Sequence, residues 1–86
     1  MRHVVHKTKG GLIRVAVDAD DRIKDIRITG DFFIYPEESV EALEKALVGV
    51  SAKEGEILKV VKDFYENIEG MDIGPEDIVN AIKRAL

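Results

Sequence analysis

The hydrophobic pattern changes its period once along this chain, near Pro36, and that change limits the folds that the chain can adopt. Before Pro36, apolar and polar residues alternate over 12–18 and 25–29, which is typical of strands with one buried face. Val4 and Val5 indicate a short opening strand that ends at the Gly10-Gly11 turn, and the Asp-rich stretch 18–22 favours a hairpin. The predicted inward residues are Ile13, Val15, Val17, Ile26 and Ile28.

After Pro36 the apolar residues recur at helical spacing, which predicts three helices. Pro36-Glu37-Glu38 and Gly74-Pro75-Glu76-Asp77 are typical helix openings, and Ser51-Ala-Lys-Glu54 matches a capping box. Gly49 and Gly70 are the expected ends of the first two helices. The predicted buried stripes are Val40, Leu43, Leu47; Ile57, Val61, Phe64, Ile68; and Ile78, Ile82, Ala85, Leu86. The sequence therefore predicts an α+β fold, a three-stranded antiparallel sheet covered on one face by about three helices.

Length and composition indicate one domain over residues 1–86 and exclude several function classes. The chain has no cysteine, which excludes disulfides, thiolate metal sites, iron–sulfur clusters and a cysteine nucleophile. We expect a cytoplasmic protein, since no apolar run could span a bilayer and the first residues lack a signal-peptide core. A pI near 5.1 argues against a nucleic-acid partner. Charge is uneven: residues 1–35 hold seven basic and five acidic residues, leaving six and twelve for residues 36–86.

None of the candidate motifs for metal binding, phosphate binding or catalysis in this chain is complete. His3 and His6 lie three apart on a strand and so point to opposite faces, which argues against a shared metal ion. Gly10-Gly11 lacks the further glycines or the Lys-Ser/Thr ending of a phosphate loop. The carboxylates of 37–44 form a solvated helix face without a nearby nucleophile. We therefore expect no catalytic, cofactor-binding or metal-binding residue in this chain.

The stretch IRITGDFF, residues 26–33, ends a predicted strand with a feature that its pattern does not explain. Gly30 suits a bend or a close backbone approach, and Asp31 can bond nearby amides. Two adjacent rings in extended structure point opposite ways, so Phe32 and Phe33 both reach one core only if the bend rotates one of them. One interpretation is that both rings cap the core. The other is that one ring, with Arg27 or Asp31, lines a contact surface.

The run GGLIRVAVDADDRIKDIRITGDFFIYPEESVEALEKALVG resembles the accessory domain at the C-terminus of lipoate–protein ligases, which in some archaea is a separate small subunit. The resemblance continues loosely through the Gly-Pro-Glu-Asp segment to the end of the chain. It implies a non-catalytic subunit required when a catalytic subunit converts lipoate and ATP to lipoyl-AMP. It does not imply a need for the subunit in lipoyl transfer. More distantly, the architecture resembles iron–sulfur scaffold proteins and their sulfur-accepting relatives (the SufE/NifU-like fold), whose cysteine chemistry is excluded here.

The resemblance implies a heterodimer with the catalytic subunit, which would hold lipoate and ATP-Mg, and an indirect relation to lipoyl-acceptor domains. No nucleic acid or membrane is expected as a partner. The expected partner-binding residues are Arg27, Gly30, Asp31, Phe32 and Phe33, of which the last four match the family stretch. The alternative is a cysteine-free interaction or regulatory module of another cytoplasmic enzyme.

Overall fold

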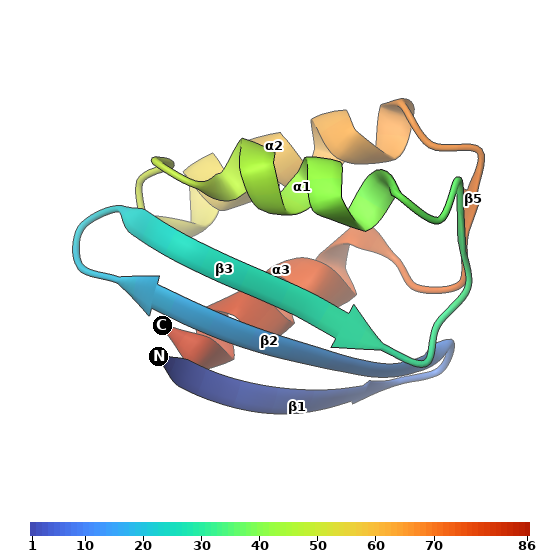
Figure 1. Cartoon of the computed structure of the whole chain (residues 1–86), viewed down its shortest axis with the longest axis horizontal. Helices are drawn as coiled ribbons and strands as arrows, with labels where there is room; N and C mark the ends of the chain where they lie inside the picture. The colour runs from blue at the N-terminus through green and yellow to red at the C-terminus, as the bar shows by residue number, and fades with distance from the viewer.

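The computed structural model describes residues 1–86 as two layers, a sheet and a group of helices above it (Figure 1). The sheet is antiparallel, in the order β1-β2-β3, and a separate two-stranded ribbon joins β4 to β5. The elements in chain order are β1 (Arg2–Thr8), β2 (Gly11–Ala19), β3 (Ile23–Gly30), β4 (Ile34–Tyr35), α1 (Ser39–Leu47), α2 (Glu54–Glu66), β5 (Gly70–Met71) and α3 (Pro75–Ala85). The predicted α+β fold is confirmed.

Alternation in the strands places one face of the sheet against the helices and leaves the other uncovered (Figure 1). The five residues predicted to point inward are all buried, at 3% exposure or less. The hairpin between β2 and β3 lies within the predicted 18–22 stretch. There, a hydrogen bond from Lys24 lowers the pKa of Asp20 to about 2.

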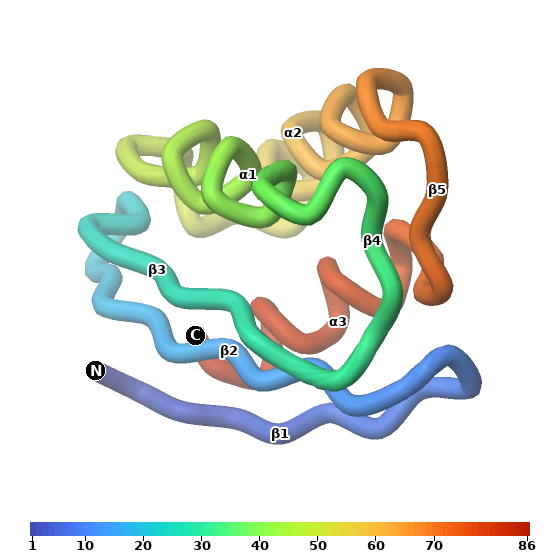
Figure 2. Tube along the Cα trace, turned by 45° about the vertical axis from the view of Figure 1, so that its right-hand side comes forward, coloured from blue at the N-terminus to red at the C-terminus, as the bar shows by residue number.

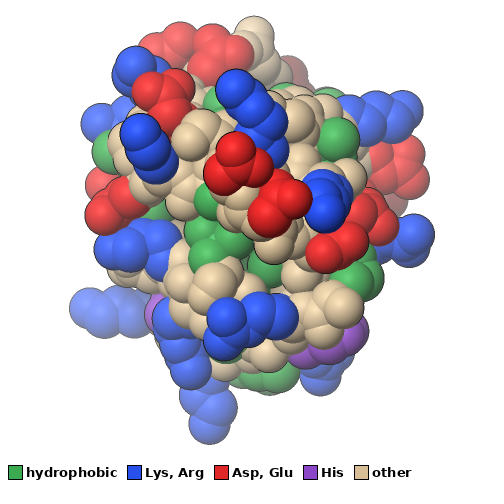
Figure 3. Space-filling model, turned by 90° about the vertical axis from the view of Figure 1, so that its left-hand side faces the viewer, with side chains coloured by type: hydrophobic (Ala, Val, Ile, Leu, Met, Phe, Trp, Pro, Cys, Tyr) green, Lys and Arg blue, Asp and Glu red, His purple; other side chains and the backbone are tan.

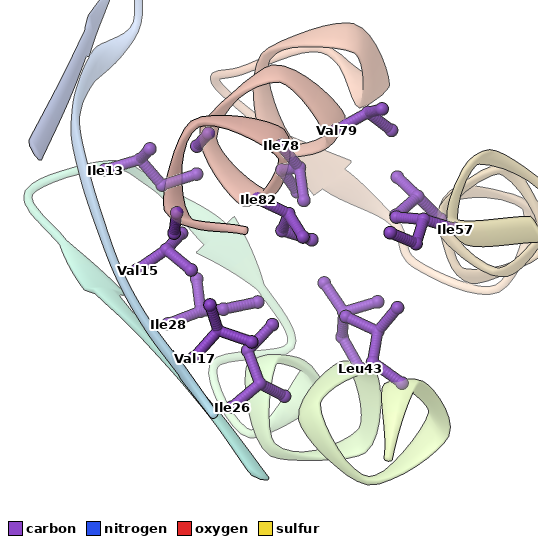
Figure 4. Packing of buried hydrophobic residues seen from close by; sticks show 14 of the residues in the cluster. Ile13, Val15, Val17, Ile26, Ile28, Leu43, Ile57, Ile78, Val79 and Ile82 are labelled. Atoms are coloured by element: carbon purple, nitrogen blue, oxygen red, sulfur yellow. The ribbon is translucent and has the colours of Figure 1, made fainter. Parts of the chain in front are cut away.

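The helices divide the cover between them. α3 packs on β1 and β2, α1 packs on β3, and α2 rests on α1 and α3 rather than on the sheet. Side chains from all of these layers meet in one core, where Leu43, Ile57 and Ile78 face the sheet residues (Figure 4). No polar side chain is buried in this core. Because the apolar stripe of each helix is directed inward, the three helices and the sheet form a single hydrophobic unit.

The first two helices begin at other residues than the sequence predicts. α1 begins at Ser39, because Tyr35 still pairs with Gly70 in the ribbon and residues 36–38 form a turn. The predicted capping box at Ser51 is wrong. Ser51 instead bridges to Arg22, and α2 begins at Glu54 with no side-chain cap. The chain there still follows the edge of the hairpin, so the helix starts later than its polar residues indicate.

The β4–β5 ribbon is absent from the sequence prediction. It closes the end of the molecule where β3 passes into α1, and Figure 2 shows its two segments running side by side. α2 ends at Glu66, so Ile68 packs against the core from the following loop and not from the helix. Gly70 accordingly lies in β5 rather than at a helix end. None of the three helices combines the length and apolar character needed to cross a membrane.

Candidate functional site

The bend after β3 is held by close backbone contact, as the sequence predicts for Gly30. A Cβ atom on Gly30 would lie 2.1 Å from the carbonyl oxygen of Leu12 and 2.8 Å from the ring of Phe32. Any side chain would therefore force the backbone apart at this position. Backbone packing alone therefore requires glycine at position 30, without any ligand. The close approach also fixes the direction in which the following residues point.

Asp31 ties this bend to the neighbouring strand. Its Oδ1 accepts a hydrogen bond from the backbone N–H of Leu12 at 2.6 Å, and its own N–H donates to the Leu12 carbonyl at 3.2 Å. Across the same corner, a Cβ on Gly11 would lie 2.6 Å from the Asp31 carbonyl oxygen. The carboxylate is exposed, yet one of its oxygens already has a backbone partner. Asp31 therefore acts first as a brace for the corner.

The two adjacent rings diverge. Phe32 is half-buried and packs against the core, whereas Phe33 is 55% exposed. The interpretation that both rings cap the core is wrong, because side-chain burial alternates along residues 32–35 and leaves Phe33 on the surface. Phe32 anchors the bend from inside, and Phe33 is left on the surface.

Tyr35 continues the exposed side of this segment. It is 53% exposed, while Ile34 between it and Phe33 is buried, so both aromatic side chains lie on the outward side of β4. The Phe33 ring reaches the neighbouring strand, since a Cβ on Gly70 would lie 3.6 Å from its Cε2 atom. We call Phe33, Tyr35 and Gly70 the aromatic ribbon. Tyr35 is not among the predicted contact residues, although the Phe-Ile-Tyr alternation at 33–35 carries the signal.

Hydrogen bonds join the two sides of the β4–β5 ribbon and tie the residues after it to α2. Asp72 bonds the Phe33 backbone twice: its Oδ2 accepts from the Phe33 N–H at 3.1 Å, and its N–H donates to the Phe33 carbonyl at 3.0 Å. One residue on, the Tyr65 hydroxyl donates to the Ile73 carbonyl at 2.7 Å. Burial, with the nearby Asp77 carboxylate second, raises the pKa of Tyr65. The exposed rings therefore stand on a rigid support.

Arg27 lies on a different surface. It projects from the uncovered face of the sheet, opposite Ala16 on β2, and helps to line a shallow hollow of about 480 Å³. His3, Arg14 and Thr29 contribute to the same hollow, and Phe33 does not. The structure thus brings Gly30, Asp31, Phe32 and Phe33 together at one corner and separates Arg27 from them.

Groups suited to metal binding are not clustered in this chain. The structure contains no set of three or more His, Asp or Glu side chains placed to hold an ion. His3 and His6 lie on opposite faces of β1, as predicted: His3 lines the hollow, and His6 Nδ1 lies 3.1 Å from the guanidinium of Arg84. The candidate site is therefore the exposed aromatic pair of Phe33 and Tyr35 on the braced corner.

Comparison with known proteins identifies the relatives of this arrangement. The family model described as the C-terminus of bacterial lipoate protein ligases matches residues 2–82. The chain belongs to this ligase C-terminal family. A curated relative, lipoate-protein ligase A subunit 2 of Thermoplasma acidophilum, is 44% identical over 79 residues, which span 90% of this chain and 82% of the relative.

A solved structure supports the same assignment for this ligase C-terminal domain. It comes from work on an archaeal lipoylation system of Thermoplasma acidophilum, described as a bi-partite lipoate protein ligase and its E2 lipoyl domain. The match has a TM-score of 0.80 at 42% identity and covers 93% of this chain and 96% of the other. The chain accordingly shares both the sequence family and the fold of the ligase C-terminal domain.

Proposed function

We propose that this chain is the non-catalytic subunit of a two-component lipoate–protein ligase and is required for activation of lipoate. In that step the lipoate carboxylate attacks the α-phosphorus of ATP, lipoyl-AMP forms and pyrophosphate leaves. The observation that carries the proposal is the similarity to subunit 2 of the Thermoplasma ligase, which spans 90% of this chain and 82% of that subunit. Lipoate, ATP and Mg²⁺ would bind the catalytic partner, and lipoyl-acceptor domains would meet that partner.

The physical contribution of such a subunit is positioning. An adenylation site gains rate when a second module closes over the reactants, excludes water and fixes their geometry. This chain supplies a compact, rigid body whose exposed aromatic side chains stand on the braced corner at Asp31 and Asp72. Transfer of the lipoyl group to a protein lysine needs an open site, so the same closure would not assist it.

The aromatic ribbon is the surface that we propose for docking at this corner. Aromatic side chains in the centre of an interface carry much of its binding energy, and Phe33 and Tyr35 are exposed on a fixed backbone. Phe32 and Gly30 set the direction of these rings from beneath, and Asp31 holds the bend. Arg27 contributes through the uncovered sheet face if the partner extends that far along β3.

Separate assays of the two half-reactions test the proposal. The catalytic subunit is given lipoate, ATP and an acceptor domain in one reaction, and ready-made lipoyl-AMP with the acceptor domain in the other, each with and without this chain. We expect lipoylation from lipoate and ATP only when the chain is present, and lipoylation from lipoyl-AMP in both cases. Equal lipoylation from lipoate and ATP without the chain would leave it as an interaction or regulatory module of another enzyme.

A further inference from the structure

One of the two edges of the sheet is covered by other parts of the chain, and the other is not. Along the edge of β3, Glu44 Oε2 accepts the Ile28 N–H at 2.6 Å, and Ile23 exchanges backbone hydrogen bonds with Gly49 and Val50. α1 and the loop after it thus cover this edge (Figures 1 and 2). β1 forms the other edge, and no strand or loop pairs with its outer side. An uncovered edge strand offers unpaired backbone groups to another chain.

The direction of these backbone groups follows from one side-chain contact. Arg84 Nη1 donates to the Val5 carbonyl at 3.3 Å, so this carbonyl points away from β2. β1 pairs with β2 without interruption, and backbone groups alternate between the two sides of such a strand. His3 and Lys7, two positions on either side of Val5, therefore also present their N–H and C=O groups outward. Only the Val5 carbonyl among them has a side-chain partner.

The side chains of β1 include basic residues and no acidic one. No acidic residue precedes Asp18, while Lys7, Lys9 and Arg14 fall in that stretch and Arg84 reaches it from α3. None of the three ion pairs of the molecule includes a residue of β1 or β2. In Figure 3, acidic side chains lie over the upper and middle parts of the molecule, and the charged side chains in the lowest part are basic. The free edge is thus positive in a chain of net charge −4.

This charge identifies the kind of strand that fits. Two copies of β1 placed edge to edge would bring their basic side chains together, and like charges opposite each other destabilise strand pairs. An acidic strand would gain both the backbone hydrogen bonds and the charge attraction. The edge therefore suits an acidic partner and opposes self-association.

We propose that β1 accepts an extended acidic segment of the catalytic subunit as an added strand of the sheet. The inference rests on the proposed function and adds a second contact with the same partner to the one proposed at the aromatic ribbon. The segment hydrogen-bonds to the backbone groups of His3, Val5 and Lys7, and Arg84 exchanges the Val5 carbonyl for a carboxylate of the segment. Added-strand binding takes its affinity from the main chain and its selectivity from such charges.

Amide hydrogen exchange, measured by NMR on this chain with and without the catalytic subunit, tests the proposal directly. The amides of His3, Val5 and Lys7 are expected to become at least tenfold slower in the complex. Those of Val4 and His6 already point toward β2 and serve as internal references. Unchanged exchange at the three outward amides in a saturated complex would overturn the proposal.

Two variants give an independent readout of affinity. Lys7→Glu is expected to weaken binding about tenfold, and more at low salt than at high salt. Lys62→Glu makes the same charge change on an exposed position of α2 and is the matched control, with less than twofold effect. Val5→Pro removes an outward N–H that no strand uses, and proline is tolerated on such edges. Equal affinity of Lys7→Glu and Val5→Pro with the native chain would contradict the proposal.

The remaining outcomes also decide the occupant. Protection of the outward amides in the chain alone, rising with its concentration, would identify a second copy and overturn the acidic segment. Protection on addition of an acceptor domain instead of the catalytic subunit would do the same. If the proposed function is wrong, the catalytic subunit activates lipoate without this chain. That result does not depend on the amide exchange measured at β1, so the two failures can be told apart.

Discussion

Replacement of Phe33 by alanine separates a contact role from a folding role at the corner after β3. Phe33 is 55% exposed and adjacent Phe32 is half-buried against the core, so the two rings form a matched pair one residue apart. Phe33→Ala is expected to weaken binding to the catalytic subunit while the domain stays folded. Phe32→Ala is expected mainly to lower the free energy of unfolding.

The magnitudes follow from the exposed area of each ring. A phenylalanine buries about 150–250 Å² when fully covered, so Phe33 keeps about 100 Å² for a partner. At about 25 cal/mol per Å² this area contributes about 2.5 kcal/mol. Ordering the side chain takes back about 0.5 kcal/mol, which leaves about a thirtyfold change in Kd. For half-buried Phe32, we expect about 2 kcal/mol of lost stability, below the roughly 3–5 kcal/mol of a fully buried ring.

Isothermal titration of the catalytic subunit gives the Kd, and urea denaturation followed by circular dichroism gives the stability of each variant. Phe33→Ala should change mainly the Kd, and Phe32→Ala should change mainly the urea midpoint. If a folded Phe33→Ala domain bound with less than a twofold change, the aromatic ribbon would not be a docking surface. Tyr35→Ala then tests whether the ribbon acts through its second ring.

Three further comparisons of variants test the structure elsewhere, each by urea or thermal denaturation. Gly30→Ala should lose about 3 kcal/mol or more through its backbone clash, whereas Gly55→Ala in open space on α2 should gain up to about 1 kcal/mol. Glu44→Ala should lose about 1.5 kcal/mol because the Ile28 N–H loses its partner, and Glu44→Gln should lose less. Because the folded pKa of Tyr65 is raised, its stabilisation is complete below the unfolded pKa near 10 and is lost as pH rises above it; Tyr65→Phe should remove that alkaline decline. Equal stability of Gly30→Ala and Gly55→Ala would contradict the first assignment, and a Glu44→Ala variant as stable as the native chain would contradict the second. The third would be wrong if Tyr65→Phe lost stability at alkaline pH as the native chain does.

The sequence predicts the layers of this fold because long periodic segments state which face is buried. Ile13, Val15 and Val17 alternate over β2, and Ile57, Val61 and Phe64 recur at helical spacing over α2, and all are buried. The β4–β5 ribbon escapes prediction because two-residue strands show no period and their pairing joins residues far apart in the chain. The capping-box pattern at Ser51 fails for a related reason, since a tertiary bridge to Arg22 overrides the local signal.

The candidate site shows the same limit. Adjacent rings after a glycine indicate that one of them must leave the core, but only the register of β4 decides that this one is Phe33. The same alternation exposes Tyr35, which lies beyond the Gly-Asp-Phe-Phe stretch on which the prediction rests. Arg27 is close to the corner in sequence, yet the pleat of β3 directs it to the uncovered sheet face. Residues that are close in sequence therefore need not share a surface when a strand directs them to opposite faces of the sheet.

Pyrophosphate release by the catalytic subunit, titrated with this chain at saturating lipoate and ATP, reports on lipoate activation itself. We predict almost no lipoate-dependent release without the chain and a rate that rises to a plateau at one equivalent. A rate that is already maximal without the chain, or that does not respond to it, would contradict the role in activation.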